Sequence, residues 1–565
     1  MWTPFLFALS AGLVSSAAQA AADGSPTPAA QVTAVPPSPP SELAILVTAG
    51  KLADLRWPDF TDRRADVAEF YTSGGYEPVW VRDGQPTAQA QTMIRLFKEA
   101  ALKGLNPEDY DASRWDSRLA TLAASDSHPS DSVLAHFDLA LTVCAERYLS
   151  ALRIGRVDPK HFNFDLETES KKYDLAEFLR SKVIQAREVG AMIASIEPQY
   201  EGYQRAEGSL ATYLKLAAQG DGTNLSLPIK SLHPGDTYSE MTPLVSRLRQ
   251  LADLASDADA PAGTTVYQGA LVDAVKHFQQ RHGLQPDGVL GKETITQLNV
   301  PLSQRVKQLQ FTLERYRWIP ENFPQPPIIV NLPEFYLRTM RRQPAPFLSM
   351  RVIVGKAYGH QTPVFADYMR YVIFRPYWEV PLSIQFAELV PKARRDRNYL
   401  AEHGFEVMDS NGTVVTDGTV TDDVLDGLRS GSLTLRQKPG PKNALGLVKF
   451  IFPNHYNVYL HSTPKPELFL KARRDFSHGC IRVHDPAALA AWVLRDKPEW
   501  TLDKIQAVMN GDQTMQVNLD HRIPVLILYS TAVVEPDGEA RFFRDIYGQD
   551  SALDKALAGG YPYSS

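Results

Sequence analysis

The chain has 565 residues, of which 44% are hydrophobic and 22% charged, so it has the composition of an ordinary globular protein and the length for several domains. Its formal net charge of -6 gives no reason to expect nucleic acid as a partner. Two cysteines in so long a chain exclude a disulfide framework.

The first 22 residues have the pattern of an export signal. An apolar run at residues 5–14 is followed by small residues and by AQA at residues 18–20, a cleavage-site pattern. About ten apolar residues are too few to span a bilayer, for which about 20 are needed. Because no Lys or Arg precedes the run, an uncleaved anchor stays open as the alternative. Residues 23–41 are rich in Ala, Pro and Ser and are interpreted as a linker.

Residues 42–229 are expected to be helical. Apolar residues between 93 and 101 recur at helix spacing, and Gly104 just beyond them is a favoured C-cap. A second helix is expected at residues 133–152. Cys144 lies on the apolar stripe of that helix, which favours a buried cysteine that acts as a small hydrophobic residue.

Residues 230–300 have the pattern of a small helical module. Two amphipathic helices are expected at residues 241–251 and 271–278. The sequence FQQRHGL then begins at residue 278 and DGVLG begins at residue 287, and this pattern resembles the peptidoglycan-binding domain, a three-helix unit. Most of these residues are packing or turn residues, so they identify the module better than any binding surface. A role as a spacer or as a protein-docking module stays open.

Residues 301–550 are expected to be mostly β. A helix at residues 305–317 leads into short β-branched and aromatic runs that are separated by Pro, Gly or polar turns. An apolar run at residues 523–529 predicts a buried strand near the end. The segment from about 384 to 440 is interpreted as an insertion that caps the domain. Its basic cluster at residues 392–397 is interpreted as a solvated helix face, with attraction of an acidic peptide as the weaker reading.

The chemistry is concentrated in residues 458–483, which read VYLHSTPKPELFLKARRDFSHGCIRV. Cys480 needs activation because a thiol attacks as the thiolate and its reference pKa is about 8.5. His461 and His478 are the local bases. Residues 458–461 predict a strand and residues 465–476 a segment that folds back, so His461 is expected beside Cys480.

A His followed some fifteen residues later by SHGC, a hydrophobic residue and Arg resembles the signature of the L,D-transpeptidase catalytic domain. The resemblance implies that Cys480 is the acyl-forming nucleophile and His461 its general base. The carbonyl of Ser462 would orient that base, and His478 would have a supporting role. The backbone N–H groups of Gly479 and Cys480 would face the developing oxyanion.

The resemblance also implies a set of substrate-binding residues. The planar guanidinium of Arg482 suits a substrate carboxylate. Tyr459, Trp378 and Ser477 complete the expected set. Arg375 stands next to the expected groove where the large members of the family usually have Asn.

The whole chain resembles the large Gram-negative members of this family, which implies a multidomain α+β protein. The expected parts are a signal peptide at 1–22, a linker at 23–41, a helical scaffold domain at 42–229, a peptidoglycan-binding domain at 230–300, a mostly β catalytic domain at 301–550 with its cap at about 384–440, and a C-terminal tail at 551–565.

The function that the resemblance implies is 3-3 cross-linking of peptidoglycan stem peptides in the periplasm. Cys480 would form a thioester with a stem tetrapeptide and release D-Ala, and the amine of a neighbouring diaminopimelate would resolve it. No cofactor is expected. A carboxypeptidase that supplies tetrapeptides and glycan-synthesising enzymes are the expected partners. Hydrolysis, the anchoring of proteins to the wall, and the oligomeric state stay open.

Two readings of another class compete with this one. A zinc site is suggested by the crowding of His455, His461, His478, Cys480 and His484, but none of the usual short paired spacings is present. A non-catalytic wall-binding scaffold would not need the cysteine and histidine of the motif.

Overall fold

The computed structural model describes residues 40–124, 129–227, 230–258, 265–340 and 347–563. The predicted export signal and nearly all of the predicted linker lie outside these ranges. The residues from Glu42 onward form one compact unit. Within the described ranges, no helix combines the length and the apolar character that a membrane crossing requires.

The helical region is built around α5 (Asp131–Ile154), in which most residues are buried. The hydroxyl of Ser130 caps this helix by accepting a hydrogen bond from the Val133 amide. The expected helix at 133–152 and the buried position of Cys144 are thereby confirmed. The other regular elements here are α1 (Glu42–Ala49), α2 (Arg64–Thr72), β1 (Val81–Arg82), β2 (Gln85–Pro86), α3 (Ala88–Lys98), α4 (Trp115–Ala123), α6 (Leu175–Phe178), α7 (Val189–Ile196) and α8 (Glu201–Ala218).

Gly155 lets a second long helix, α12 (Leu302–Arg317), approach the end of α5. A Cβ at Gly155, whose φ is +86°, would lie 2.7 Å from Trp318 Nε1. The buried Glu314 of α12 accepts from the Arg156 amide and, at 3.0 Å, from Arg156 Nε. Burial opposes the ionisation of Glu314, but the guanidinium groups of Arg156 and Arg317 outweigh it and lower its pKa. A buried ion pair therefore joins the helical region to α12.

The small module has the three helices that the sequence predicts: α9 (Met241–Gln250), α10 (Ala270–Arg281) and α11 (Lys292–Leu298). Its motif residues contact one another. The buried side chain of Gln279 donates to Asp287 Oδ1 at 2.9 Å and accepts from the Gly288 amide at 2.8 Å. These motif residues therefore stabilise the turn after α10.

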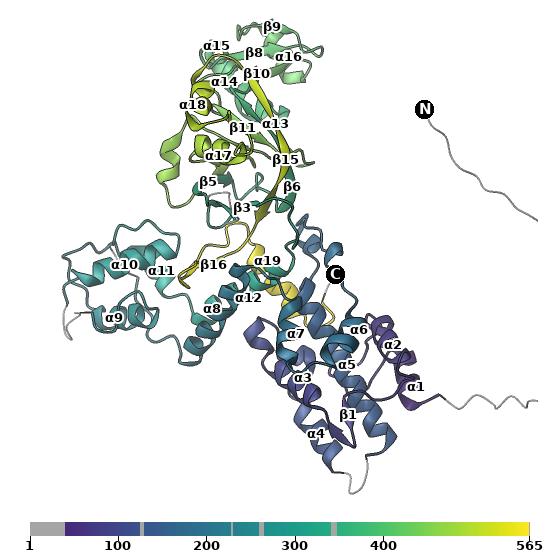
Figure 1. The fold of residues 1–565 in the computed structure, drawn as a ribbon. Helices are drawn as coiled ribbons and strands as arrows, with labels where there is room; N and C mark the ends of the chain where they lie inside the picture. Colours follow the sequence, from purple (N-terminus) through teal and green to yellow (C-terminus); the bar gives the residue numbers. More distant parts are fainter. Residues whose placement is uncertain (1–39, 125–128, 228–229, 259–264, 341–346, 564–565) are drawn as a thin grey trace, which may run out of the picture. The chain divides into compact units, whose positions relative to one another are not determined.

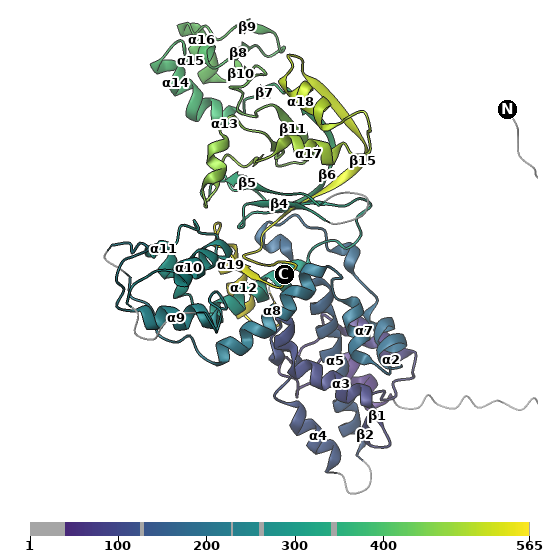
Figure 2. The ribbon, with the colours of Figure 1, turned by 60° about the vertical axis from the view of Figure 1, so that its left-hand side comes forward.

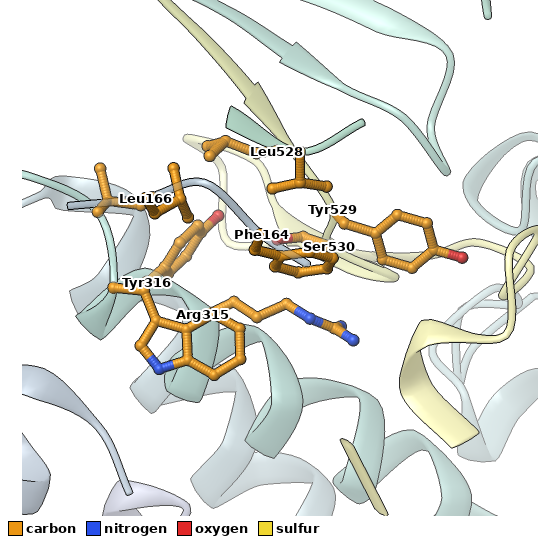
Figure 3. A pocket seen from close by; sticks show the side chains of 10 residues that line it. Phe164, Leu166, Arg315, Tyr316, Leu528, Tyr529 and Ser530 are labelled. Atoms are coloured by element: carbon orange, nitrogen blue, oxygen red, sulfur yellow. The ribbon is translucent and has the colours of Figure 1, made fainter. Parts of the chain in front are cut away.

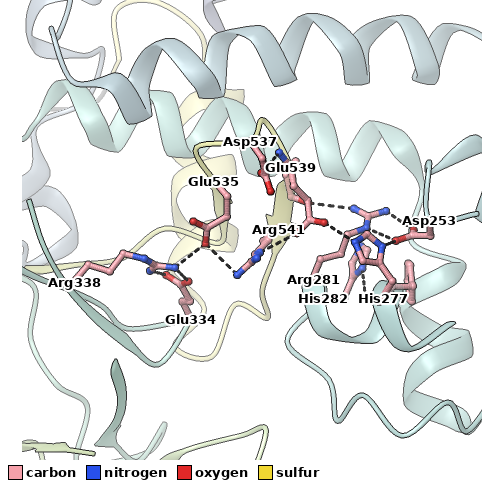
Figure 4. Close-up of polar contacts among 12 residues, drawn as sticks. Asp253, His277, Arg281, His282, Glu334, Arg338, Glu535, Asp537, Glu539 and Arg541 are labelled. Atoms are coloured by element: carbon pink, nitrogen blue, oxygen red, sulfur yellow. Dashed lines mark hydrogen bonds and ion pairs between the residues drawn. The ribbon is translucent and has the colours of Figure 1, made fainter. Parts of the chain in front are cut away.

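A chain of ion pairs joins this module to the hairpin of β16 (Ala532–Val534) and β17 (Ala540–Phe542), and the hairpin to the catalytic sheet (Figure 4). His277 is central, with Nδ1 2.8 Å from Asp253 Oδ1 and Nε2 2.7 Å from Glu539 Oε2. The remaining links are Arg281–Asp253 (2.5 Å), Arg541–Glu539 (3.0 Å), Arg541–Glu535 (3.1 Å), Arg338–Glu535 (2.8 Å) and Arg338–Glu334 (2.6 Å).

Raising the pH through the pKa of His277 is expected to loosen the module from the hairpin. The hydrogen bond to Asp253 and the charges of Asp253 and Glu539 raise this pKa, against burial and the charge of Arg281. The stabilisation is therefore fully present below the unfolded-state pKa of about 6.5 and is lost as the pH rises through the folded-state value. Hydrogen exchange of α10, corrected for intrinsic rates, checks this. An unchanged pH dependence in His277→Gln would contradict it.

The catalytic domain is a nine-stranded sheet in the order β13-β5-β14-β12-β11-β6-β15-β3-β4, and β4 also pairs with β5, so the sheet closes on itself. The strand runs expected from the sequence are confirmed. The strands are β3 (Ile328–Asn331), β4 (Tyr336–Thr339), β5 (Ser349–Gly355), β6 (Phe365–Phe374), β11 (Val448–Ile451), β12 (Leu460–His461), β13 (Asp475–Ser477), β14 (Ile481–Val483) and β15 (Met515–Leu528). Helices α17 (Pro486–Val493) and α18 (Leu502–Asn510) contribute to its core.

The inserted segment folds around a hydrophobic cluster of its own. Its four-stranded sheet has the order β7-β10-β8-β9, and its elements gather beyond one end of the catalytic sheet (Figure 2). This sheet begins at Trp378, six residues before the predicted start, because β7 pairs with β10. The elements are β7 (Trp378–Glu379), α13 (Leu382–Ile384), the π-helical turn η6 (Gln385–Leu389), α14 (Val390–Arg395), α15 (Tyr399–Glu402), β8 (Phe405–Met408), β9 (Val414–Thr416), α16 (Asp422–Ser430) and β10 (Thr434–Gln437).

Near its C-terminal end, where the sequence predicts a tail from residue 551, the chain forms the helix α19 (Gln549–Ala558). Leu553 of this helix is buried, and Asp550 pairs with Arg315 of α12 at 2.5 Å. Beyond the helix, the hydroxyl groups of Tyr561 and Tyr563 donate to Asp62 and Asp109 of the helical region. These contacts, which cross hundreds of residues, explain why local sequence patterns miss the segment.

A small void lies where the end of α12 meets β15 and residues 164–166 (Figure 3). Its volume is about 10 Å³, and its walls include Phe164, Leu166 and Leu528. A void of this size is at the lower limit for one water molecule. It is a packing defect and too small for a ligand.

Candidate active site

Cys480 and His461 are brought together by two neighbouring strands. β12 and β14 are parallel, and His461 lies opposite Arg482 in their register. Strand β12 is shorter than the expected 458–461, and the chain returns to β14 through the 3-10 turn η7 (Pro466–Leu470) and β13. Within the described residues Cys480 and His461 share no hydrogen bond: the thiol lies 3.7 Å from the carbonyl oxygen of Asn457. Such contacts commonly tighten only when substrate binds.

His461 is buried and held by its neighbour. Its Nδ1 lies 2.5 Å from the carbonyl oxygen of Ser462, and the backbone of Leu445 is a second hydrogen-bond partner, so the ring is fixed by its neighbours. The expected role of the Ser462 carbonyl matches this contact. Burial lowers the pKa of His461 to about 3, aided by the charges of Arg482 and Lys449. The imidazole is therefore neutral at physiological pH, the form that a general base needs.

Burial raises the pKa of the Cys480 thiol, so the resting pair is a neutral thiol beside a neutral imidazole. Hydrogen bonds from the amide and hydroxyl of Tyr459 and the charges of Arg482 and Lys449 act in the opposite direction. The ring of Tyr459 lies 5.8 Å from that of His461. Tyr459 is therefore next to the reacting atoms, where it can stabilise a thiolate.

The loop before Cys480 is tied by its own side chains. The buried hydroxyl of Ser477 donates to the carbonyl of Cys480 at 2.5 Å and accepts from the amide of Gly479 at 3.2 Å. The Gly479 amide is thus engaged, while the Cys480 amide has no acceptor among the described residues. Thr362 holds the Gly479 carbonyl at 2.7 Å. This leaves Cys480 as the better-placed oxyanion donor, and substrate contact by Ser477 stays a prediction.

Two cations flank His461 in one row of the sheet. Lys449 lies opposite His461 in the pairing of β11 with β12, and Arg482 lies opposite it on the other side. Arg482 has no hydrogen bond or ion pair within the described ranges, and its Nε is buried without a partner. An unpaired buried cation is costly, so this row offers charge to an anionic ligand. Sequence reasoning missed Lys449. The alternation of apolar and polar residues in Val448, Lys449 and Phe450 is typical of a strand and could have shown that Lys449 lies on the opposite face from its apolar neighbours.

Gly446→Ala is expected to lower acylation of Cys480 by at least about tenfold, since a misplacement of about 1 Å at a site can cost a hundredfold. A Cβ at Gly446, whose φ is +64°, would lie 2.5 Å from Ser462 Oγ and so push the residue that orients His461. Gly412→Ala is the matched control, because it has a φ of +78° and no atom within 4 Å of the added carbon. Equal losses in both variants would show that backbone strain alone is responsible.

The cap touches the catalytic loop through one carboxylate. Glu388 of η6 lies 2.5 Å from Nε2 of His478, two residues before the cysteine. Gln385 anchors this turn by donating to the carbonyls of Leu428 and Leu433 at 2.9 and 3.0 Å. The ring of His360 packs edge-on against His478 with centroids 4.8 Å apart. His478 therefore links the loop before Cys480 to the cap through a contact that no sequence pattern signals, and its supporting role in catalysis stays a prediction.

Glu388→Gln is expected to lower the acylation rate about two- to fivefold, in line with about 0.4–1 kcal/mol for a part-exposed hydrogen bond to a carboxylate. The variant should also lose part of the salt dependence of the wild-type rate, because it removes one anion while Lys449 and Arg482 remain in place. Stopped-flow or mass-spectrometric acylation kinetics measure both. Glu402→Gln, an exposed change in α15 of the cap, is the control and should leave the rate unchanged.

The remaining candidates lie apart from the thiol. Trp378 packs against Phe405 of the cap, with ring centroids 6.2 Å apart, so its contact with substrate stays a prediction. His484 packs against Phe469, and His455 is exposed beside Asp165. Among the described residues, no three His, Cys, Asp or Glu side chains are grouped as metal ligands.

Comparison with known proteins gives three family matches. Residues 65–210 match the model of a "Scaffold domain", residues 239–298 that of a "Putative peptidoglycan binding domain", and residues 326–513 that of the "L,D-transpeptidase catalytic domain". A "Putative L,D-transpeptidase" of Haemophilus influenzae is 31% identical over 272 residues. That alignment covers 47% of this chain and 54% of the relative, so the chain matches about half of the relative's length. The expected resemblance is confirmed: residues 326–513 resemble an L,D-transpeptidase catalytic domain and follow segments that resemble a scaffold domain and a peptidoglycan-binding domain.

Proposed function

We propose that the protein is a cysteine-dependent L,D-transpeptidase that joins stem peptides of peptidoglycan by 3-3 cross-links. The observation that carries this proposal is the row Lys449, His461 and Arg482 beside Cys480. It combines a nucleophile, a neutral base and two cations, of which the Arg482 guanidinium has no carboxylate partner in the described part of the chain. An acyl donor with a free carboxylate, such as a stem tetrapeptide, suits this set.

In the first half-reaction, His461 takes the thiol proton and Cys480 Sγ attacks the carbonyl carbon of the third stem residue. The tetrahedral oxyanion is stabilised by the amide of Cys480. The Sγ–C bond remains while the C–N bond to the terminal D-Ala breaks, and the imidazolium returns its proton to the leaving amine. The products are a thioester and free D-Ala.

In the second half-reaction, the side-chain amine of diaminopimelate in a neighbouring stem attacks the thioester. His461 accepts its proton, the C–S bond breaks, and the thiol is restored. One amide bond is broken and one is made, so no nucleotide is consumed. Exclusion of water favours the amine over hydrolysis, and the cap anchored at His478 is placed to exclude it.

The proposed reaction determines which enzymes have to supply the substrates and where the protein has to be located. Tetrapeptides have to be supplied by a carboxypeptidase, and glycan-synthesising enzymes supply the strands. Both substrates lie outside the cytoplasm, which agrees with the export signal expected at residues 1–22. We therefore propose a periplasmic location.

Intact-protein mass spectrometry with disaccharide-tetrapeptide tests the proposal. A covalent adduct on the signal-free wild type, together with muropeptide dimers in solution, supports the transpeptidase. An adduct that resolves only to tripeptide points to carboxypeptidase chemistry, and transfer to a protein lysine points to anchoring. No adduct, with sacculus binding retained, would leave a wall-binding scaffold in place of an enzyme.

A further inference from the structure

The scaffold domain contains a cleft of about 510 Å³ between α4 and the first turns of α5, far in sequence from the catalytic motif. This volume lies within the range of small-ligand sites, about 300–1,000 Å³. Eight of its ten lining residues have polar side chains, including Ser117, Arg118 and His136, while apolar atoms, among them those of Val133 and Phe137, make up the larger part of the lining surface. The cleft is therefore large and polar enough to take a ligand of its own.

Arg118 is fixed at this cleft by carboxylates. Its Nη2 donates to Asp111 Oδ2 at 2.5 Å, and its Nε lies 3.2 Å from Asp54 Oδ2. The guanidinium lies over the ring of Trp115 at 4.7 Å, and only 10% of the side chain is exposed. Asp54 is held in turn by Arg114, whose Nη1 donates to its backbone carbonyl at 2.7 Å. The two charged groups are thus preorganised by their neighbours.

Both groups keep an unused atom. Arg118 Nη1 is a buried donor and Asp54 Oδ1 a buried acceptor, and neither has a hydrogen-bond partner among the described residues. His136 Nδ1 comes within ion-pair distance of Asp54 Oδ1 at 3.4 Å. A buried polar atom without a partner costs about 1–3 kcal/mol. A ligand that accepts from Arg118 and donates to Asp54 would recover that cost.

The charge balance selects the class of ligand. The charges of Arg114 and Arg118 are balanced by Asp54 and Asp111, and Glu42 lies beside Ser132 at 2.7 Å and near His136 at 3.8 Å. A phosphate or another small anion would meet these carboxylates. A group of adjacent hydroxyl and N-acetyl functions supplies donors and acceptors together, with apolar ring faces for Val133 and Phe137.

We propose that this cleft binds an amino-sugar oligosaccharide. If the proposed function holds, the ligand is the glycan strand whose stem peptides the catalytic domain joins, so this inference rests on that function for the identity of the saccharide. The scaffold domain would then hold the glycan while the peptide reaches Cys480. Strand binding and acyl transfer would be separate contributions of one chain.

Titration of the full chain with chitotetraose, a peptide-free β-1,4-linked tetramer of N-acetylglucosamine, tests the cleft by calorimetry. Ser117→Trp fills the cleft from an exposed position and should weaken binding at least about tenfold, or 1.4 kcal/mol. Ala120→Trp, on the same helix but outside the lining, should leave the dissociation constant unchanged. Asp54→Asn removes the charge of the acceptor without changing the shape of the side chain, and should weaken binding several-fold.

Equal affinities of the wild type and Ser117→Trp would overturn the proposal, because the saccharide would then bind elsewhere, for example on the peptidoglycan-binding module. Absence of binding at millimolar chitotetraose and to peptide-free glycan strands would do the same. Thermal melting confirms that each variant is folded. Acylation of Cys480 by a saccharide-free tetrapeptide, followed in the same samples, separates failure of the cleft from failure of the catalytic proposal.

Discussion

Cys480→Ala is expected to abolish the acyl-enzyme and to lower transpeptidation by more than about a thousandfold, as loss of a catalytic nucleophile does in other acyl-transfer enzymes. The side chain is partly exposed and its polar contacts, to the carbonyl of Asn457 at 3.7 Å and to Tyr459, are weak sulfur contacts, so its removal should change the free energy of unfolding by about 1 kcal/mol. Mass spectrometry of the adduct and thermal melting measure the two effects.

The other cysteine supplies the matched control. Cys144 is fully buried in α5, and burial raises the pKa of its thiol, so it is inert as a nucleophile. Cys144→Ala should therefore keep the adduct while losing some stability through a small cavity. An adduct on Cys480→Ala, or its loss in Cys144→Ala, would contradict the assignment of the nucleophile.

His461→Gln is expected to slow acylation by about a hundred- to ten-thousandfold, the usual contribution of a general base. Glutamine can still donate to the carbonyl of Ser462, so the variant keeps a polar group at a buried position. The effect should appear in the rate of acylation more than in substrate affinity, because His461 acts on the thiol proton. An acylation rate within threefold of the wild type would exclude this role.

The pH profile follows from the direction of the two pKa shifts. His461 has a pKa of about 3, so it is already a free base across pH 5–8 and no imidazole limb is expected there. The raised pKa of Cys480 keeps the thiol protonated in the same range. Without its base, His461→Gln should depend on free thiolate, and its rate should rise about tenfold per pH unit. Alkylation of Cys480 by iodoacetamide between pH 5 and 8 compares the two slopes.

The sequence suffices for the parts of the site that lie within one short stretch. The spacing from His461 to Cys480 predicts their meeting because a single return of the chain joins two neighbouring strands. Apolar periodicity likewise predicts α5 and the strands of the catalytic sheet. These features can be predicted because the buried face of a helix or strand requires apolar residues at a regular spacing in the sequence.

The parts that the sequence does not predict depend on contacts between distant segments. Glu388 is 90 residues from His478, and a lone glutamate in a helical insertion has no pattern that marks it. The sequence likewise cannot predict that Arg482 Nε lacks a hydrogen-bond partner, because this depends on the positions of all the neighbouring residues. The contact of the Trp378 ring with Phe405 of the cap is another that no local pattern predicts.

The contacts of Tyr561 and Tyr563 affect how the chain folds during its synthesis. Tyr563 donates to Asp109, 454 residues earlier, and Arg156 lies over its ring at 5.6 Å. Tyr561 reaches Asp62 across 499 residues, with Arg147 4.2 Å from its ring. Ribosomes add about 5–20 residues per second, so these partners wait roughly 20 to 100 seconds for their tyrosines. The helical region is therefore synthesised long before its contacts with these tyrosines can form. A nascent chain stopped at residue 550 would expose this region to chaperones and proteases without those contacts.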